Sequence, residues 1–236
     1  MRFSFAAMAV TALLFTAASL LLGSGYMETQ QQISELETAE STDAQERVNE
    51  HMEELEEQIS GLPDGYEVKG HADWEQAGMF AAHVYEDSEG AFEKDWGLLL
   101  ALEAEKQNID PFVVYELLRV ETGDTFDPEL VGPETQYGHA YGMAQFMENT
   151  GPWIAEMAGL PYEKELLFDP QYAIQLSVTY LSYLHDRYEG NWDEALTAYH
   201  RGMSGMKQYV QENGDAASWY AVEIQEKAEA METALR

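Results

Sequence analysis

The chain has 236 residues, enough for one or two domains with a hydrophobic core. It carries 12 Lys and Arg against 44 Asp and Glu, a formal net charge of −32, so nucleic acid is not an expected partner, because binding phosphates requires concentrated positive charge. The absence of cysteine excludes disulfides, a thiol nucleophile and cysteine-ligated metal. The six histidines form no H-E-x-x-H pattern, and neither a metal nor another cofactor is expected.

The N-terminal segment is hydrophobic. Residues 3–22 are apolar or small, follow Arg2 and precede Gly23-Ser24-Gly25. A stretch of about 20 such residues can span a bilayer or form a long signal peptide. Arg2 is the only basic residue before Arg47, which predicts that the rest of the chain is extracytoplasmic. We therefore expect residues 1–26 to be a signal anchor or a signal peptide, and the protein to be membrane-anchored or secreted.

An acidic helix is predicted next, over residues 27–61. The stretch is rich in Glu and Gln, and apolar residues recur at spacings of four, three and four at Val48, Met52, Leu55 and Ile59. This seam is short for a coiled coil. A solvated stalk near the membrane is the main interpretation, and a weak homodimer formed through the stalk is the alternative. Turn residues at 61–65 end the helix.

The remaining chain predicts further helices. A connecting helical region at 62–91 contains a helix over 72–85, and another helix covers 91–107. Asp110-Pro111 and Gly123 are typical start and stop signals of a helix of about three turns. Two more helices begin at Asp169-Pro170 and at Asn191. No alternating strand pattern of useful length is present, so the fold class is mainly α, with the main domain at 92–215 and a helical tail at 216–236.

Glu121 lies near the end of the helix that begins at Pro111. Val114, Leu117 and Leu118 share its face at helical spacing, which predicts that Glu121 belongs to the buried stripe. Tyr115, Glu116 and Arg119 are predicted to lie on a wetter face. Lost hydration and the negative end of the helix dipole would both raise the pKa of Glu121, as a general acid in glycoside cleavage requires. The alternative is a helix-end glutamate that reaches water or caps a loop.

Three stretches resemble, in order, the motifs of one enzyme family. "VETGDTFDP" resembles the segment that holds the catalytic glutamate, with Thr122 in place of the usual serine. "AYGMAQFMENT" resembles the glycine-x-x-glutamine-x-methionine stretch, and "ALTAYHRG" resembles the alanine-tyrosine-asparagine-x-glycine segment. Residues 92–210 therefore resemble the lysozyme-like lytic transglycosylases of the soluble, goose-lysozyme-related (SLT) group.

The resemblance implies a helical lysozyme-like domain that binds peptidoglycan glycan strands. It implies cleavage of the β-1,4 bond between N-acetylmuramic acid and N-acetylglucosamine, with Glu121 as acid and then base and a 1,6-anhydro sugar as product. It also assigns substrate-binding residues. Gly142 matches a glycine that allows close backbone approach, and Gln145 and Met147 match groove residues. Tyr199 matches a tyrosine that steadies the glutamate, and His200 replaces an asparagine, so different sugar contacts are expected there.

Two alternatives to this function stay open at the level of sequence. The first is an inverting muramidase on the same fold, in which a second carboxylate about 6.5–9.5 Å from the first activates water. Four acidic residues follow Glu121 and could supply it: Asp124, Asp127, Glu129 and Glu134. The second is a non-catalytic cell-wall binding or assembly protein.

Overall fold

The computed structural model describes residues 60–63, 66 and 74–235 of the chain. The chain divides into two compact units, and all the described residues belong to the second, Gln58–Arg236. The predicted signal segment lies outside the described residues, as does the predicted stalk apart from its last two residues. Within the part of the chain that is described, no helix is both long and apolar enough to cross a membrane.

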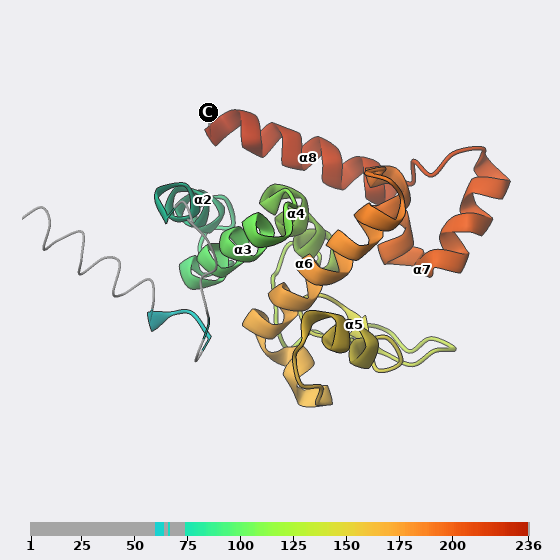
Figure 1. The fold of residues 1–236 in the computed structure, drawn as a ribbon, viewed down its shortest axis with the longest axis horizontal. Helices are drawn as coiled ribbons and strands as arrows, with labels where there is room; N and C mark the ends of the chain where they lie inside the picture. Colours follow the sequence, from blue (N-terminus) through green and yellow to red (C-terminus); the bar gives the residue numbers. More distant parts are fainter. Residues whose placement is uncertain (1–59, 64–65, 67–73, 236) are drawn as a thin grey trace, which may run out of the picture. The chain divides into compact units, whose positions relative to one another are not determined.

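The second unit is built mainly from helices, which confirms the predicted fold class (Figure 1). Helix α3 packs against α2, α4 and α6, and α8 packs against α4 and α7. The helices are α2 (Trp74–Asp87), α3 (Lys94–Gln107), α4 (Pro111–Thr122), α5 (Gly151–Ala158), α6 (Pro170–Arg187), α7 (Trp192–Asn213) and α8 (Trp219–Leu235), with a 3-10 helix η1 at Lys164–Phe168.

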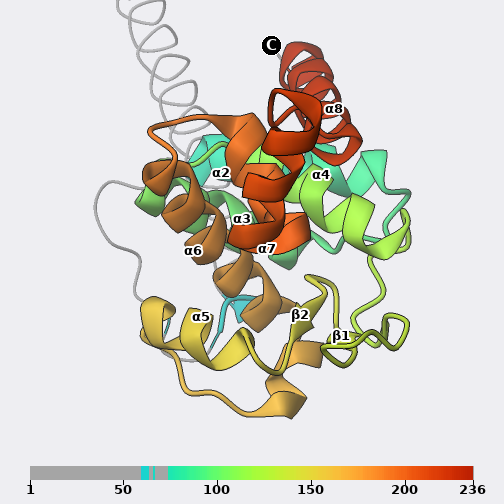
Figure 2. The same ribbon diagram turned by 90° about the vertical axis from the view of Figure 1, so that its right-hand side faces the viewer.

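One short antiparallel hairpin interrupts the helical fold. Strand β1 (Ala140–Tyr141) pairs with β2 (Phe146–Met147), with Tyr141 opposite Phe146. Each strand is only two residues long, too short for an alternating pattern to be recognised in the sequence. Figure 2 shows the hairpin and α5 together at one end of the unit, below α4, α7 and α8.

The predicted capping residues form the helix starts. The carboxylate of Asp110 accepts a hydrogen bond from the backbone N–H of Phe112 and caps α4, and Asp169 caps α6 through the N–H of Tyr172. The side chain of Asn191 caps α7 in the same way. Gly123 ends α4 in the left-handed conformation, with φ of 60°. The local signals thus fix where the helix that carries Glu121 begins and ends.

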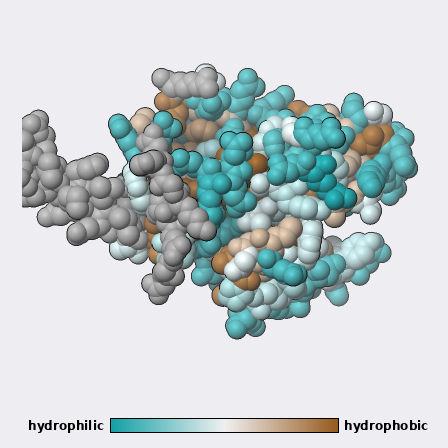
Figure 3. All heavy atoms as spheres, viewed as in Figure 1, coloured by the Kyte–Doolittle hydropathy of each residue, from teal (hydrophilic) through white to brown (hydrophobic). Residues whose placement is uncertain are grey.

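The core lies mainly between α3, α4, α6, the first half of α7 and α8, and its members include Leu99, Leu117, Leu181, Leu196 and Ile224. On the face shown in Figure 3 the surface is mostly hydrophilic, with smaller hydrophobic areas. The core is therefore apolar despite the large excess of acidic residues in the chain.

Candidate active site

Glu121 lies on the last turn of α4, where the core meets solvent. Val114, Leu117 and Leu118, its neighbours on the predicted stripe, are all 0 % exposed, whereas Glu121 itself is half-buried. The prediction of a buried stripe that ends in a carboxyl group is confirmed.

The predicted wetter face of α4 is wrong, because both Tyr115 and Glu116 are fully buried. The Tyr115 hydroxyl donates to Asp87 Oδ2 of α2 at 2.9 Å, and Arg119 forms an ion pair with the same carboxylate. Burial raises the pKa of Glu116 to about 7, against the opposing charge of Lys227 on α8. Helix α8 packs on α4 and covers this face. Because the face carries polar side chains, the sequence of α4 alone does not show that another helix buries it.

The carboxyl group of Glu121 is held by Tyr220, a residue that lies outside the three sequence motifs. The Tyr220 hydroxyl donates a hydrogen bond to Glu121 Oε1 at 2.6 Å. Burial raises the pKa of Glu121 to about 7, and the hydrogen bond from Tyr220 opposes that shift only in part. Glu121 is therefore poised to exchange a proton near neutral pH.

Tyr220 lies in the first turn of α8, and hydrogen bonds hold the start of this helix against α7. The hydroxyl groups of Thr197 and Ser218 lie 2.6 Å apart, and the Thr197 hydroxyl donates to the carbonyl of Ala216 at 2.7 Å. Ser218 Oγ also accepts from the N–H of Ala221 in the first turn of α8. The helical tail predicted at 216–236 thus supplies a side chain to the candidate site.

Tyr199 lies beside Glu121 but does not hold it through its hydroxyl. That hydroxyl donates to the carbonyl of Ala144 at 3.2 Å, and the ring contacts Phe146 and Tyr180 with centroids 5.7 and 5.3 Å away. Burial first, and then the charge of Glu121, raise the pKa of Tyr199 well above its ordinary value. The expectation that Tyr199 steadies the glutamate is corrected: in the structure Tyr220 makes the hydrogen bond.

Gly142 and Gln145 shape the turn of the hairpin. Gly142 has φ of +71°, and a Cβ atom there would lie 1.8 Å from the carbonyl oxygen of Leu167, so the required close approach is to the protein's own backbone. Gln145, at φ of 50°, donates through Nε2 to the carbonyl oxygens of Gly142 at 2.8 Å and Leu130 at 3.3 Å. Both residues have structural partners within the domain.

The methionines of this segment differ in exposure. Met143 is fully buried in the core, whereas Met147 is half-buried on β2. Of the two, Met147 is the one that retains surface for a ligand.

His200 is exposed and stacks on the ring of Tyr220, with centroids 4.6 Å apart and planes at 6°. Two residues later, Gly202 adopts φ of 71° and ψ of 159° and kinks α7. His200 therefore contacts the same tyrosine that binds the Glu121 carboxyl group.

The four acidic residues considered as a second catalytic carboxylate do not share the half-buried environment of Glu121. Asp124 Oδ1 lies 4.0 Å from Arg119 Nε, and Asp127 Oδ1 accepts from the N–H of Glu129 at 2.9 Å. All four, including Glu134, are exposed. Among the described residues, none of them forms a hydrogen bond or an ion pair with the partners of Glu121.

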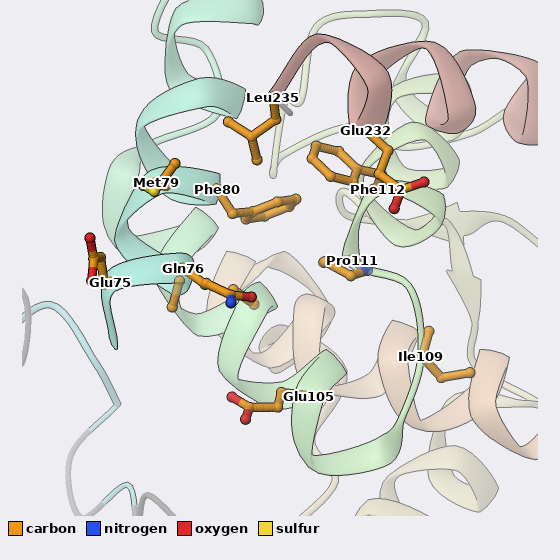
Figure 4. A pocket seen from close by; sticks show the side chains of 12 residues that line it. Glu75, Gln76, Met79, Phe80, Glu105, Ile109, Pro111, Phe112, Glu232 and Leu235 are labelled. Carbon is orange, nitrogen blue, oxygen red and sulfur yellow. The ribbon is translucent and has the colours of Figure 1, made fainter. Parts of the chain in front are cut away.

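A separate cavity of about 710 Å³ lies between α2, α3, α4 and α8 (Figure 4). Phe80, Phe112 and Leu235 line it, with the carboxylates of Glu75 and Glu105 among the other lining residues. None of the candidate site residues lines this cavity, so it is not part of the site around Glu121.

Comparison with known proteins identifies the family. A model of the transglycosylase SLT domain matches residues 99–222, more than half of the 236-residue chain. The chain belongs to this SLT family. The match confirms the resemblance seen in the sequence motifs, and it includes Tyr220 as well as the predicted site residues.

Among solved structures, the SLT domain is similar to an inactive mutant of the lytic transglycosylase Slt from Pseudomonas aeruginosa. The two share 18 % sequence identity with a TM-score of 0.49, and the match covers 66 % of this chain and 30 % of the Pseudomonas chain. No curated protein matches the chain.

Proposed function

We propose that the SLT domain is a peptidoglycan lytic transglycosylase that cleaves the β-1,4 bond between N-acetylmuramic acid and N-acetylglucosamine. The observation that carries this proposal is the state of Glu121 within the matched domain. Its half-buried carboxyl group has a pKa raised to about 7 and accepts a hydrogen bond from Tyr220 at 2.6 Å. A purely binding or assembly protein requires no such acid.

Glu121 acts first as an acid and then as a base. Its proton goes to the glycosidic oxygen as the bond from that oxygen to C1 of the muramoyl residue breaks. The resulting carboxylate takes the proton of the C6 hydroxyl of the same sugar, whose oxygen bonds to C1 and closes the 1,6-anhydro ring. Glu121 is protonated again at the end, and no water is consumed. The tethered hydroxyl supplies the nucleophile by proximity.

Tyr220 supports the step in which Glu121 is charged. A hydroxyl that donates to a carboxylate stabilises the charged form, so the hydrogen bond strengthens when the proton leaves. Gln145, Met147 and His200 are proposed to contact the sugars, and Gly142 to shape the turn that presents them. Tyr199 contributes to the wall beside the carboxyl group.

The pH dependence of lysis tests the pairing of Glu121 with Tyr220. Lysis should fall as pH rises through about 7, because the first step needs the protonated acid. Tyr220→Phe removes the hydrogen bond that lowers the pKa of Glu121, so the alkaline limb of the profile should move to higher pH and turnover should fall about tenfold.

Tyr199→Phe is the matched control for this measurement. It removes a hydroxyl that donates to Ala144 and not to Glu121, so the alkaline limb should stay where it is in the unmodified protein. A limb that moves with Tyr199→Phe and stays with Tyr220→Phe would contradict the assignment.

The tethered nucleophile predicts that no second carboxylate is needed. Changing Asp124, Asp127, Glu129 and Glu134 singly to their amides should leave lysis of purified cell wall largely intact. Loss of lysis in one of these variants, with the fold retained, would favour the inverting muramidase in its place.

The proposed substrate places the SLT domain outside the cytoplasm. We propose that residues 3–22 either anchor the protein in the membrane or are removed as part of a signal peptide. Determining the N-terminus of the mature protein decides between them: a start just after Gly25 shows cleavage, and retention of residues 3–22 supports the anchor.

A further inference from the structure

An aromatic cluster of His200, Trp219 and Tyr220 extends outward from Glu121. His200 stacks on Tyr220, and the indole of Trp219 contacts both rings edge-on, with centroids 5.6 Å from His200 and 5.7 Å from Tyr220. The hydroxyl of Tyr220 reaches Glu121 Oε1. The cluster therefore forms a continuous series of contacts from the candidate acid to the surface.

The outer members of the aromatic cluster are open to solvent. Tyr220 is 1 % exposed, whereas Trp219 is 57 % exposed and His200 is also exposed. Tryptophan is on average highly buried in folded proteins, because its large apolar surface is stabilised by removal from water. More than half of this side chain is not used to cover the core, and it remains available to a ligand.

The backbone under Trp219 is held in place. Trp219 is the first residue of α8, and it directly follows Ser218, whose hydroxyl group lies 2.6 Å from that of Thr197 on α7. A ligand that binds a side chain on a fixed helix start loses little free energy to ordering the protein. The position of Trp219 therefore suits a preorganised binding surface.

The chemistry of the aromatic cluster indicates what it binds. The His200 ring loses part of its hydration where it stacks on Tyr220, and this desolvation, together with the neighbouring charge of Arg201, lowers the pKa of His200 and favours the neutral ring. The exposed surface thus consists of flat, uncharged rings beside an acid. Flat apolar side chains in a binding site favour a ligand with an apolar face, and a pyranose ring presents its C–H groups on such a face. A glycan strand continues beyond the bond that is cleaved and brings further pyranose rings close to Glu121.

We propose that Trp219 and His200 form a sugar-binding subsite that takes a pyranose ring of the glycan strand outside the pair of sugars joined by the cleaved bond. This proposal rests on the proposed function, because it assigns part of the same substrate to a new surface. Trp219 provides the main contact, and His200 supports it while packing on Tyr220.

The test measures glycan binding in the Glu121→Gln background, in which the strand is not cut. The probe is soluble peptidoglycan glycan strands freed of their peptides, and the dissociation constant is measured by calorimetry. Trp219→Leu keeps an apolar side chain but removes the flat face, and it should raise the dissociation constant about three- to tenfold. Trp219→Phe keeps a flat ring and should change the constant less than about twofold.

Tyr85→Ala is the control for loss of an exposed aromatic ring. Tyr85 is 39 % exposed on α2, where Lys94 lies over its ring, and its removal should leave the dissociation constant unchanged. Thermal unfolding of each variant checks that the fold is kept. Equal binding by the folded Trp219→Leu variant and its parent overturns the subsite alone. A parent that binds no glycan overturns the proposed function, and the subsite with it.

Discussion

Glu121→Gln is expected to lower the lysis of purified cell wall by at least about 100-fold while the protein remains folded. The amide has nearly the shape of the carboxyl group, and its oxygen still accepts a hydrogen bond from Tyr220. It cannot donate a proton to the glycosidic oxygen or take one from the C6 hydroxyl, so both proposed steps fail. Lysis is followed by the release of soluble fragments from cell wall.

Thermal unfolding provides the control for this substitution. The pKa of Glu121 is raised from 4.5 to about 7 by folding, so between these values the folded protein holds a proton that the unfolded chain has lost. The contribution of Glu121 to stability therefore falls as pH rises through this window. The Gln variant lacks this contribution and should gain stability relative to its parent as pH rises. The buried Glu116 titrates in both proteins, so it does not affect the difference between them. A folded Gln variant with substantial lysis would remove Glu121 from the mechanism.

Gly142→Ala should lower the free energy of unfolding by at least about 2 kcal/mol. The left-handed backbone costs a residue with a Cβ atom about 1 kcal/mol or more. The new atom would also lie 1.8 Å from the carbonyl oxygen and 2.8 Å from the carbonyl carbon of Leu167, so β1 or η1 must shift. Overpacking of this kind costs a further 1–3 kcal/mol or so. Denaturant unfolding measures the change.

Gly159→Ala is a closely matched control for Gly142→Ala. Gly159 has φ of +70°, close to the +71° of Gly142, but a Cβ atom there would meet nothing within 4 Å. Its substitution should cost only the backbone term, about 1 kcal/mol. Equal losses of unfolding free energy in the two variants would show that contact between the new Cβ atom and Leu167 does not destabilise the protein. If the Gly142→Ala variant keeps its stability but binds glycan more weakly, the close approach at this glycine serves the substrate and not the packing of the protein.

The sequence predicted those features that depend on neighbouring residues. Asp110, Pro111 and Gly123 determine the limits of α4 through local capping, and helical spacing places Glu121 on the stripe of Val114 and Leu118. These signals lie within one segment of chain, so they are readable without knowledge of the rest of the fold.

The features that the sequence did not predict depend on contacts between distant segments. Tyr220 is 99 residues from Glu121 in the chain. Nothing in the residues next to Tyr220 in the sequence marks this tyrosine as a partner of a carboxyl group. Glu116 is buried because α8 covers α4, which no periodicity within α4 reveals. The family motifs led to Tyr199, which lies beside Glu121 but donates its hydroxyl elsewhere.

Mass analysis of the fragments released from purified cell wall tests the central claim most directly. Transfer to the C6 hydroxyl leaves an anhydro end, whereas hydrolysis adds one water and leaves a reducing end. Because the proposed mechanism of Glu121 uses the tethered hydroxyl and no activated water, the main products should be fragments that end in 1,6-anhydro-muramic acid. Fragments that end mainly in reducing muramic acid would contradict the mechanism and identify the protein as a hydrolase.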